Sequence, residues 1–107
     1  MIEVYCRVQY EATHSWDSCN IEEVSYLKNE HRHVFYIVAY KKVNHANRDT
    51  EFIVLKHKIE NFLRRTYPTR QLGSMSCEML AEKLCERFDL SKCDVSEDNE
   101  NGAVVYK

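Results

Sequence analysis

The sequence predicts an α+β domain with the element order β-β-α-α-β-β, in which a four-stranded antiparallel sheet carries two helices on one face. Apolar residues alternate with polar ones near both ends of the chain, a period of two that indicates strands. Between about residues 49 and 88 they recur every three or four positions, which indicates helices. Strands and helices grouped in such blocks are typical of α+β domains.

Composition limits the class of protein. A chain of 107 residues with 44% hydrophobic and 30% charged side chains suits one globular domain with a modest core. Its net charge of -2 argues against a nucleic-acid binder, and no apolar run approaches the roughly 18 residues of a membrane span. The five cysteines form no Cys-x-x-Cys pair and the first residues lack a signal peptide's basic start, so we expect reduced thiols in a cytoplasmic protein.

The first half of the chain predicts two strands joined by a long loop. Alternation from Ile2 to Tyr10 continues to His14, and a second apolar, aromatic strand runs from His31 to Val43. The intervening residues 15–29 have no sustained period, so we expect a loop with a helical turn near residues 21–26. Loops this long in a compact domain are often functional.

The second half predicts two helices and two strands. An apolar stripe begins near Asp49, and this helix should end before Pro68, because the residue preceding a proline avoids the helical region. The next helix should start at Ser76, a good N-cap, and end near residue 88. A third strand then covers residues 93–98, and Asn101-Gly102 is a hairpin-turn signal before a last strand at residues 103–106.

Three histidines fall where the first two strands should meet. His31 and His33 lie two apart on a strand and so point to the same face, and His14 ends the neighbouring strand. If the strands pair across the loop, all three imidazoles can reach one metal ion. Zinc sites with three protein ligands leave a fourth position open, and nitrogen ligands also suit iron and nickel. The other interpretation is three partly exposed histidines at a sheet edge.

Several motifs resemble the 6-pyruvoyl-tetrahydropterin synthase and 6-carboxy-tetrahydropterin synthase family, which has the tunnelling fold. Tyr10-Glu11-Ala12-Thr13-His14 is similar to the end of the family's first strand. His31-Arg32-His33 resembles its His-Gly-His, with arginine in place of glycine. Glu51-Phe52-Ile53-Val54-Leu55-Lys56 and Ser76-Cys77-Glu78-Met79-Leu80-Ala81 resemble its two helix starts. Glu97 and the strand Ala103-Val104-Val105-Tyr106 complete a series in the family's order that covers nearly the whole chain.

The resemblance implies a zinc-dependent lyase acting on dihydroneopterin triphosphate, in biopterin, folate or deazapurine (queuosine) synthesis. It implies that the three histidines bind Zn²⁺, which grips the hydroxyls of the substrate's side chain. Glu97 would anchor the pterin ring, because a carboxylate matches the paired N–H donors of a 2-amino-4-oxo ring. Ser76 and Cys77 would lie beside the ring. The resemblance also implies sheets joined into a barrel as a homotrimer or homohexamer, with Glu97 serving a neighbouring subunit's metal site.

Two departures from the family pattern concern catalysis. The family's catalytic cysteine lies four or six residues before its His-x-His, where this chain has Leu27 and Ser25, so Cys19 in the same loop is the remaining catalytic candidate. The family's Asp-His pair between the helices has no counterpart in residues 67–72, and His45 and His57 are not obvious replacements. Each lost acid or base costs about 10²–10⁴-fold in rate. The sequence therefore supports two hypotheses: an active pterin synthase, or a member that binds a pterin or purine-like ligand without the usual turnover.

Overall fold

The structure, a computed structural model, describes residues 1–107 and contains the predicted series of elements. A short 3₁₀ helix, η1, lies in the loop that joins the first two strands. The elements are β1 (Ile2–His14), η1 (Glu22–Lys28), β2 (His31–Val43), α1 (Phe52–Thr66), α2 (Cys77–Phe88), β3 (Lys92–Glu97) and β4 (Asn101–Tyr106).

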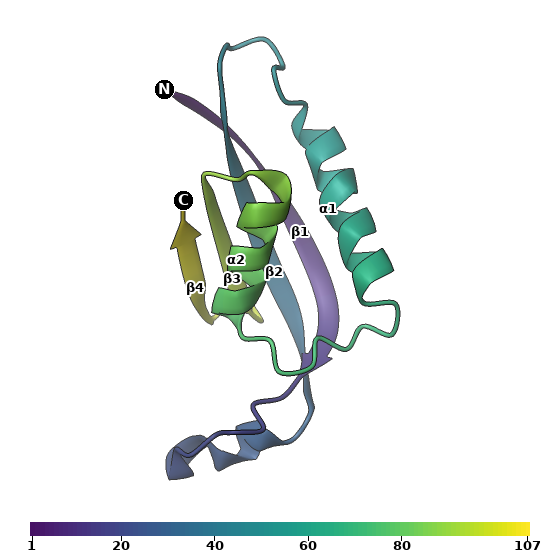
Figure 1. Cartoon of the computed structure of the whole chain (residues 1–107), viewed down its shortest axis with the longest axis vertical. Helices are drawn as coiled ribbons and strands as arrows, with labels where there is room; N and C mark the ends of the chain where they lie inside the picture. Colours follow the sequence, from purple (N-terminus) through teal and green to yellow (C-terminus); the bar gives the residue numbers. More distant parts are fainter.

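The four strands form one antiparallel sheet in the order β1-β2-β3-β4, as the sequence predicts. β1 and β2 pair along their whole length, and the last pair joins His14 to His31. The loop between them extends beyond the end of the sheet, which makes the molecule long and narrow, 50 × 26 × 21 Å (Figure 1). The paired ends of β1 and β2 therefore form the base of this loop.

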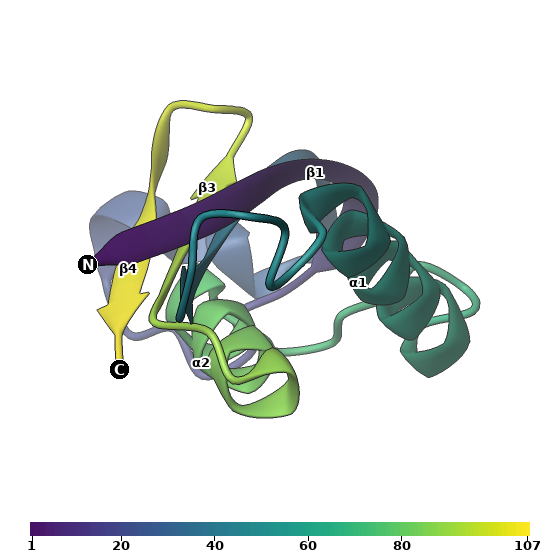
Figure 2. The same cartoon turned by 90° about the horizontal axis from the view of Figure 1, so that it is seen from above.

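Both helices cover the same face of the sheet, as predicted (Figure 2). Helix α1 packs against β1, and α2 packs against β3 and β4. One core of 19 buried residues fills the space between the layers, including Ile59 and Leu63 from α1, Leu80 and Leu84 from α2. None of the helices is long and apolar enough to cross a membrane.

The helix ends follow from local chemistry. Helix α1 begins at Phe52, slightly later than predicted, because the Glu51 carboxylate accepts hydrogen bonds from the first backbone N–H groups. It ends at Thr66, before Pro68. Ser76 caps α2 as predicted, with its hydroxyl accepting a hydrogen bond from the Met79 N–H. These caps fix where the polypeptide enters the site described below.

The predicted Asn101-Gly102 turn is wrong. The turn lies at Asp98 and Asn99, whose φ angles of 55° and 59° are in the left-handed region that these residue types tolerate best after glycine. The Glu100 N–H closes it on the Glu97 carbonyl, and Gly102 is already inside β4. Glycine is required there because an added Cβ would lie 2.1 Å from the Val95 carbonyl oxygen.

Replacing Gly102 by Ala should therefore destabilise the protein although the change adds one methyl group. The obstructing atoms belong to the backbone of β3, so β4 must shift, and we expect a loss of about 1–3 kcal/mol of unfolding free energy. Urea denaturation measures this loss. Ala103→Gly, on the next position of the same strand, is a control for altered backbone freedom, to which it adds the loss of one partly buried methyl group. A Gly102→Ala protein as stable as the wild type would contradict the close approach.

The aromatic strand β2 contributes Phe35 to the core beneath the helices, where its side chain is fully buried. The prediction for the cysteines is confirmed, since all five are free thiols and all five are buried.

Candidate metal centre

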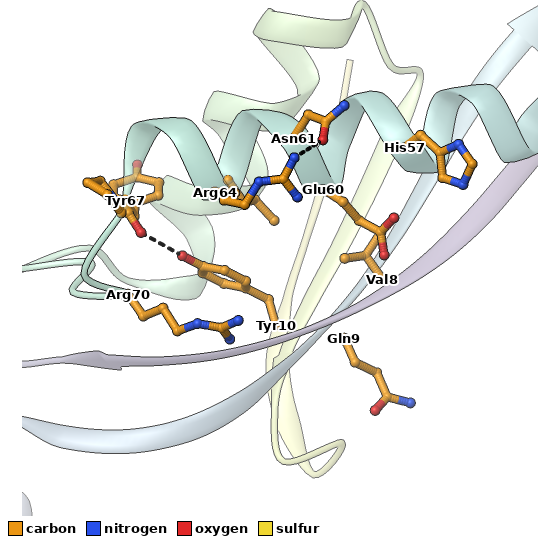
Figure 3. A pocket seen from close by; sticks show the side chains of 11 residues that line it. Val8, Gln9, Tyr10, His57, Glu60, Asn61, Arg64, Tyr67 and Arg70 are labelled. Atoms are coloured by element: carbon orange, nitrogen blue, oxygen red, sulfur yellow. Dashed lines mark hydrogen bonds between the residues drawn. The ribbon is translucent and has the colours of Figure 1, made fainter.

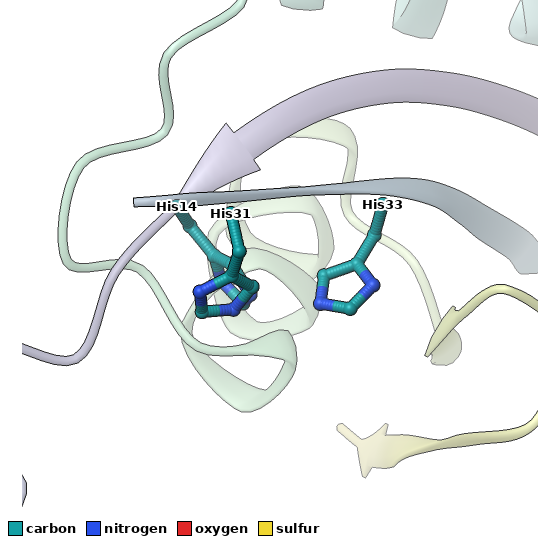
Figure 4. Close-up of side chains that lie close together, drawn as sticks. All are labelled: His14, His31 and His33. Carbon is teal, nitrogen blue, oxygen red and sulfur yellow. The ribbon is translucent and has the colours of Figure 1, made fainter. Parts of the chain in front are cut away.

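His14, His31 and His33 come together at the base of the long loop (Figure 4). Each offers a ring nitrogen, and these three nitrogens lie within 4.8 Å of one another. The ring centroids are 4.6–5.3 Å apart and the rings meet edge to face. The β1–β2 register produces this arrangement, because it sets His14 opposite His31 with His33 on the same face.

Each imidazole is oriented by a hydrogen bond through its Nδ1 atom. Nδ1 of His14 lies 2.7 Å from the Met75 carbonyl oxygen, and Nδ1 of His31 lies 2.7 Å from that of Asn29. Nδ1 of His33 lies 2.7 Å from a carboxylate oxygen of Asp98. None of these oxygens carries a hydrogen, so each Nδ1 must donate one. In the neutral rings, every Nε2 atom therefore carries a free lone pair.

The segment between the helices supplies the acceptor for His14. Backbone hydrogen bonds join it to the end of β1: Thr13 N–H donates to Arg70 O at 2.9 Å, and Leu72 N–H donates to Thr13 O at 2.8 Å. This attachment carries the chain alongside His14, so that Met75 O reaches its ring and α2 begins next to it. Acceptors of this kind fix the tautomer and ring orientation of metal-ligating histidines.

The Nε2 atoms of His14 and His33 are buried without a hydrogen-bond partner, and a carboxylate faces both. Glu97 Oε2 lies 3.0 Å from Nε2 of His14, and Oε1 lies 3.6 Å from Nε2 of His33. A lone pair facing an anionic oxygen at this distance is repulsive unless a cation lies between them. A proton on Nε2 of His14 relieves part of this repulsion, because His14 then donates a hydrogen bond to Glu97. This hydrogen bond raises the pKa of His14 and lowers the pKa of Glu97.

These residues also fit a metal ion. Imidazole nitrogens and a carboxylate are among the ligands that zinc prefers, and here ring nitrogens of all three histidines lie within 4.8 Å of one another, with Nε2 of His14 and of His33 unpartnered. A buried polar atom without a partner costs about 1–3 kcal/mol, a cost that coordination removes. The predicted histidine ligand set is thus close enough to hold one metal ion.

Asp98 is a component of this site that the sequence analysis missed. Its carboxylate accepts from Nδ1 of His33 and from the Val34 N–H at 3.0 Å, and its own N–H donates to Val34 O at 2.8 Å. The hydrogen bond from His33 lowers the pKa of Asp98, which therefore stays ionised. A carboxylate that accepts from a histidine in this way is common where the histidine binds zinc. An Asp directly after the candidate Glu97 was the available signal.

Asp98→Asn should weaken metal binding without removing a ligand. Asparagine keeps an acceptor for His33 and tolerates the positive φ, but it lacks the negative charge that strengthens the hydrogen bond from the ring. We expect the Zn²⁺ affinity to fall by about tenfold, at the lower end of what loss of such a partner causes. Competition with a chromophoric chelator measures it. Glu100→Gln, which removes a charge from the same turn without touching a histidine, should match the wild type; equal affinities for all three proteins would contradict the role of Asp98.

A cavity of about 490 Å³ adjoins the histidines and opens onto the start of α2. Its lining includes the three predicted ring-binding residues Glu97, Ser76 and Cys77. Trp16, Leu27, Met75 and Met79 add apolar surface, so that a flat heterocycle would meet both apolar and polar groups. Burial raises the pKa of the Cys77 thiol to about 12, which leaves it protonated and unreactive near neutral pH.

The catalytic candidate Cys19 does not line this cavity. Its thiol is buried within the loop and donates to the carbonyl oxygens of Ile21 and Val24, both at 3.7 Å. Of the two positions where the family pattern requires a cysteine, Leu27 lines the cavity and Ser25 is exposed. The remaining histidines are elsewhere: His45 faces Asp49 at 3.5 Å, and His57 is on α1.

A second hollow lies between β1 and α1, with a volume of about 550 Å³ (Figure 3). It is larger than the cavity beside the histidines, but several of its polar groups are already paired. Tyr10 donates to Tyr67 O at 3.4 Å, Arg64 bonds to Asn61, and Arg70 donates to Glu11 O at 3.3 Å. It lacks a convergent set of unpartnered atoms, so the histidine cluster is the better candidate for a functional site.

Comparison with family models and with curated proteins gives no match for this chain. The argument for function therefore rests on the site's own chemistry.

Proposed function

We propose that this protein binds a zinc ion through His14, His31 and His33 and holds a pterin or purine-like heterocycle in the adjoining cavity, without the turnover usual in the pterin synthases it resembles. The observation that carries the proposal is the arrangement of the three rings: every Nδ1 is occupied by an oxygen acceptor, and the three rings each bring a nitrogen within 4.8 Å of the others. Three partly exposed histidines at a sheet edge would not need three separate acceptors.

The heterocycle follows from the polar groups around the cavity. Glu97 presents an ionised carboxylate, which can accept two hydrogen bonds from the amino and ring N–H groups of a 2-amino-4-oxo ring. Ser76 and Cys77 lie at the same wall, and Trp16 offers an aromatic surface. Pterins and guanine share this donor edge, which is why both classes are included.

The absence of an adequate base argues against the usual turnover. Leu27 contributes only apolar surface, the Cys77 thiol stays protonated, and the Cys19 thiol is engaged with two carbonyl groups away from the cavity. Zinc bound by the histidines would supply a Lewis acid for ligand hydroxyls. The protein's own residues would bind and orient the ring, but none of those described is poised to remove a carbon-bound proton.

Metal analysis of protein purified without a histidine tag tests the first part of the proposal. We expect about one zinc ion per chain, and a zinc content near zero after growth with added zinc would overturn the proposal.

Calorimetric titration of the zinc-loaded protein with neopterin and with guanosine tests the second part of the proposal, the binding of a heterocycle. Failure of both compounds to bind would overturn this part. Incubation with dihydroneopterin triphosphate, followed by assays for triphosphate and acetaldehyde, tests the third part of the proposal, the lack of the usual turnover. Sustained release of triphosphate or acetaldehyde would instead establish the synthase activity.

We also propose that the chain assembles as a homotrimer or homohexamer, as in the tunnelling fold. Both outer strands, β1 and β4, have an unpaired edge, which favours strand pairing with another chain. On the face away from the helices, neighbouring residues Tyr5, Tyr40, Lys92 and Tyr106 form a row across all four strands. The Lys92 ammonium lies 4.6 Å from the Tyr40 ring centroid and 5.5 Å from that of Tyr106.

Light scattering coupled to size exclusion measures the assembly directly. The proposal predicts the mass of three or six chains, and Tyr106→Glu, which places a charge on this exposed row, should shift the protein toward smaller species. A wild-type protein that stays monomeric at high concentration would contradict the assembly.

A further inference from the structure

The position of the Glu97 carboxylate points to a second role for this residue. It was expected to anchor a ring, and to serve a metal site on a neighbouring subunit. Within this chain it lies against the histidines, with its side chain 30% exposed. β3 pairs with β2 so that Glu97 lies opposite Phe35, two positions from His33.

The separations between Glu97 and two of the histidines are close to those between ligands of one ion. Four ligands of a tetrahedral zinc, each bonded at about 2.0–2.1 Å, lie about 3.3–3.4 Å from one another. The Glu97 oxygens lie 3.0 Å and 3.6 Å from the Nε2 atoms of His14 and His33, on either side of that value. The two Nε2 atoms are also the buried side-chain atoms that lack a hydrogen-bond partner.

We propose that Glu97 is the fourth ligand of the metal ion held by the three histidines, so that the ligand-free site is closed to water. The inference rests on the proposed metal binding. It adds that a molecule reaching the ion must first displace the carboxylate: one bond between a Glu97 oxygen and the ion breaks, and one to the incoming oxygen forms. A carboxylate that ligates the ion cannot anchor a ring at the same time, so metal ligation and ring binding by Glu97 exclude each other.

Cobalt substitution tests the proposal through a spectrum rather than through activity. The visible absorption of Co²⁺ depends on its coordination geometry, and azide changes it when a coordination position is open. We expect the cobalt-loaded wild type to show an intense four-coordinate spectrum that azide leaves unchanged. Glu97→Ala should show a weaker spectrum that azide alters, together with a Zn²⁺ affinity lower by more than the roughly 10–100-fold that a metal's supporting groups account for.

Two further variants make the result decisive. Glu97→Gln keeps the size of the side chain but loses its charge, and it should fall between the wild type and Glu97→Ala. Glu100→Gln, on the adjacent turn, should behave as the wild type. If azide alters the spectrum of the wild type, or if Glu97→Ala retains the wild-type spectrum and affinity, Glu97 is not a ligand and the proposed function still stands. If the wild type takes up no metal ion, both proposals are overturned.

Discussion

Replacing His31 by Ala should abolish tight zinc binding while the protein remains folded. The ring is partly exposed and its only hydrogen bond is to the carbonyl of Asn29 in the adjoining loop, so its removal costs the core little. Its loss takes away one of three nitrogen ligands, and we expect the Zn²⁺ affinity to fall by more than the roughly 10–100-fold that supporting residues account for. Chelator competition measures the affinity, and circular dichroism establishes that the variant is folded.

His14→Ala should have the same effect on zinc with a larger effect on stability. His14 is the buried member of the set, and its ring packs edge to face against Phe35 with centroids 5.2 Å apart. His45→Ala is the matched control, because His45 is exposed and its polar neighbours, Asp49 and the Asn47 N–H, are remote from the histidine cluster. Undiminished zinc affinity in both His31→Ala and His14→Ala would show that the ion binds elsewhere on the chain.

The sequence carries enough information to predict the sheet and the meeting of the histidines. Uninterrupted alternation across β1 and β2 leaves one compatible pairing through the loop, and this pairing alone sets His14 opposite His31. The helix starts were predictable for a similar local reason, since Ser76 is followed directly by an apolar helical stripe and caps α2. In both cases, residues close in sequence decide the structure.

The parts of the site that could not be predicted depend on contacts between distant residues. Two of the three histidine acceptors are backbone carbonyls, and a carbonyl has no signature in the sequence: Met75 is 61 positions from His14. The error at the β3–β4 turn had a related consequence. Placing the turn at Asn101-Gly102 treats Asp98 as the solvated end of a strand, whereas the actual turn at Asp98 and Asn99 directs the Asp98 carboxylate toward His33.

Phe35→Ala should have the largest effect on stability and should also weaken metal binding. Phe35 is buried beneath the helices, and its ring meets those of His14 and His33 edge to face, with centroids 5.2 and 5.8 Å away. Truncating a buried phenylalanine costs about 3–5 kcal/mol, a large part of the stability of a small domain. The cavity left behind also removes the support that holds both histidine rings in place, so we expect reduced Zn²⁺ affinity in the protein that remains folded.

Ile59→Ala separates these two effects of Phe35. Ile59 is buried in α1, and its truncation costs about 2–5 kcal/mol, whereas the rings of His14 and His33 meet the ring of Phe35. Denaturant unfolding with and without zinc should show a similar loss of stability for both variants in the absence of the ion. A free zinc concentration of 100 times the dissociation constant stabilises a folded protein by about 2.7 kcal/mol. At one fixed concentration of free zinc, the gain in unfolding free energy should be the same for Ile59→Ala as for the wild type. The gain should be smaller for Phe35→Ala. Equal increments would show that the histidines keep their orientation without the phenylalanine ring.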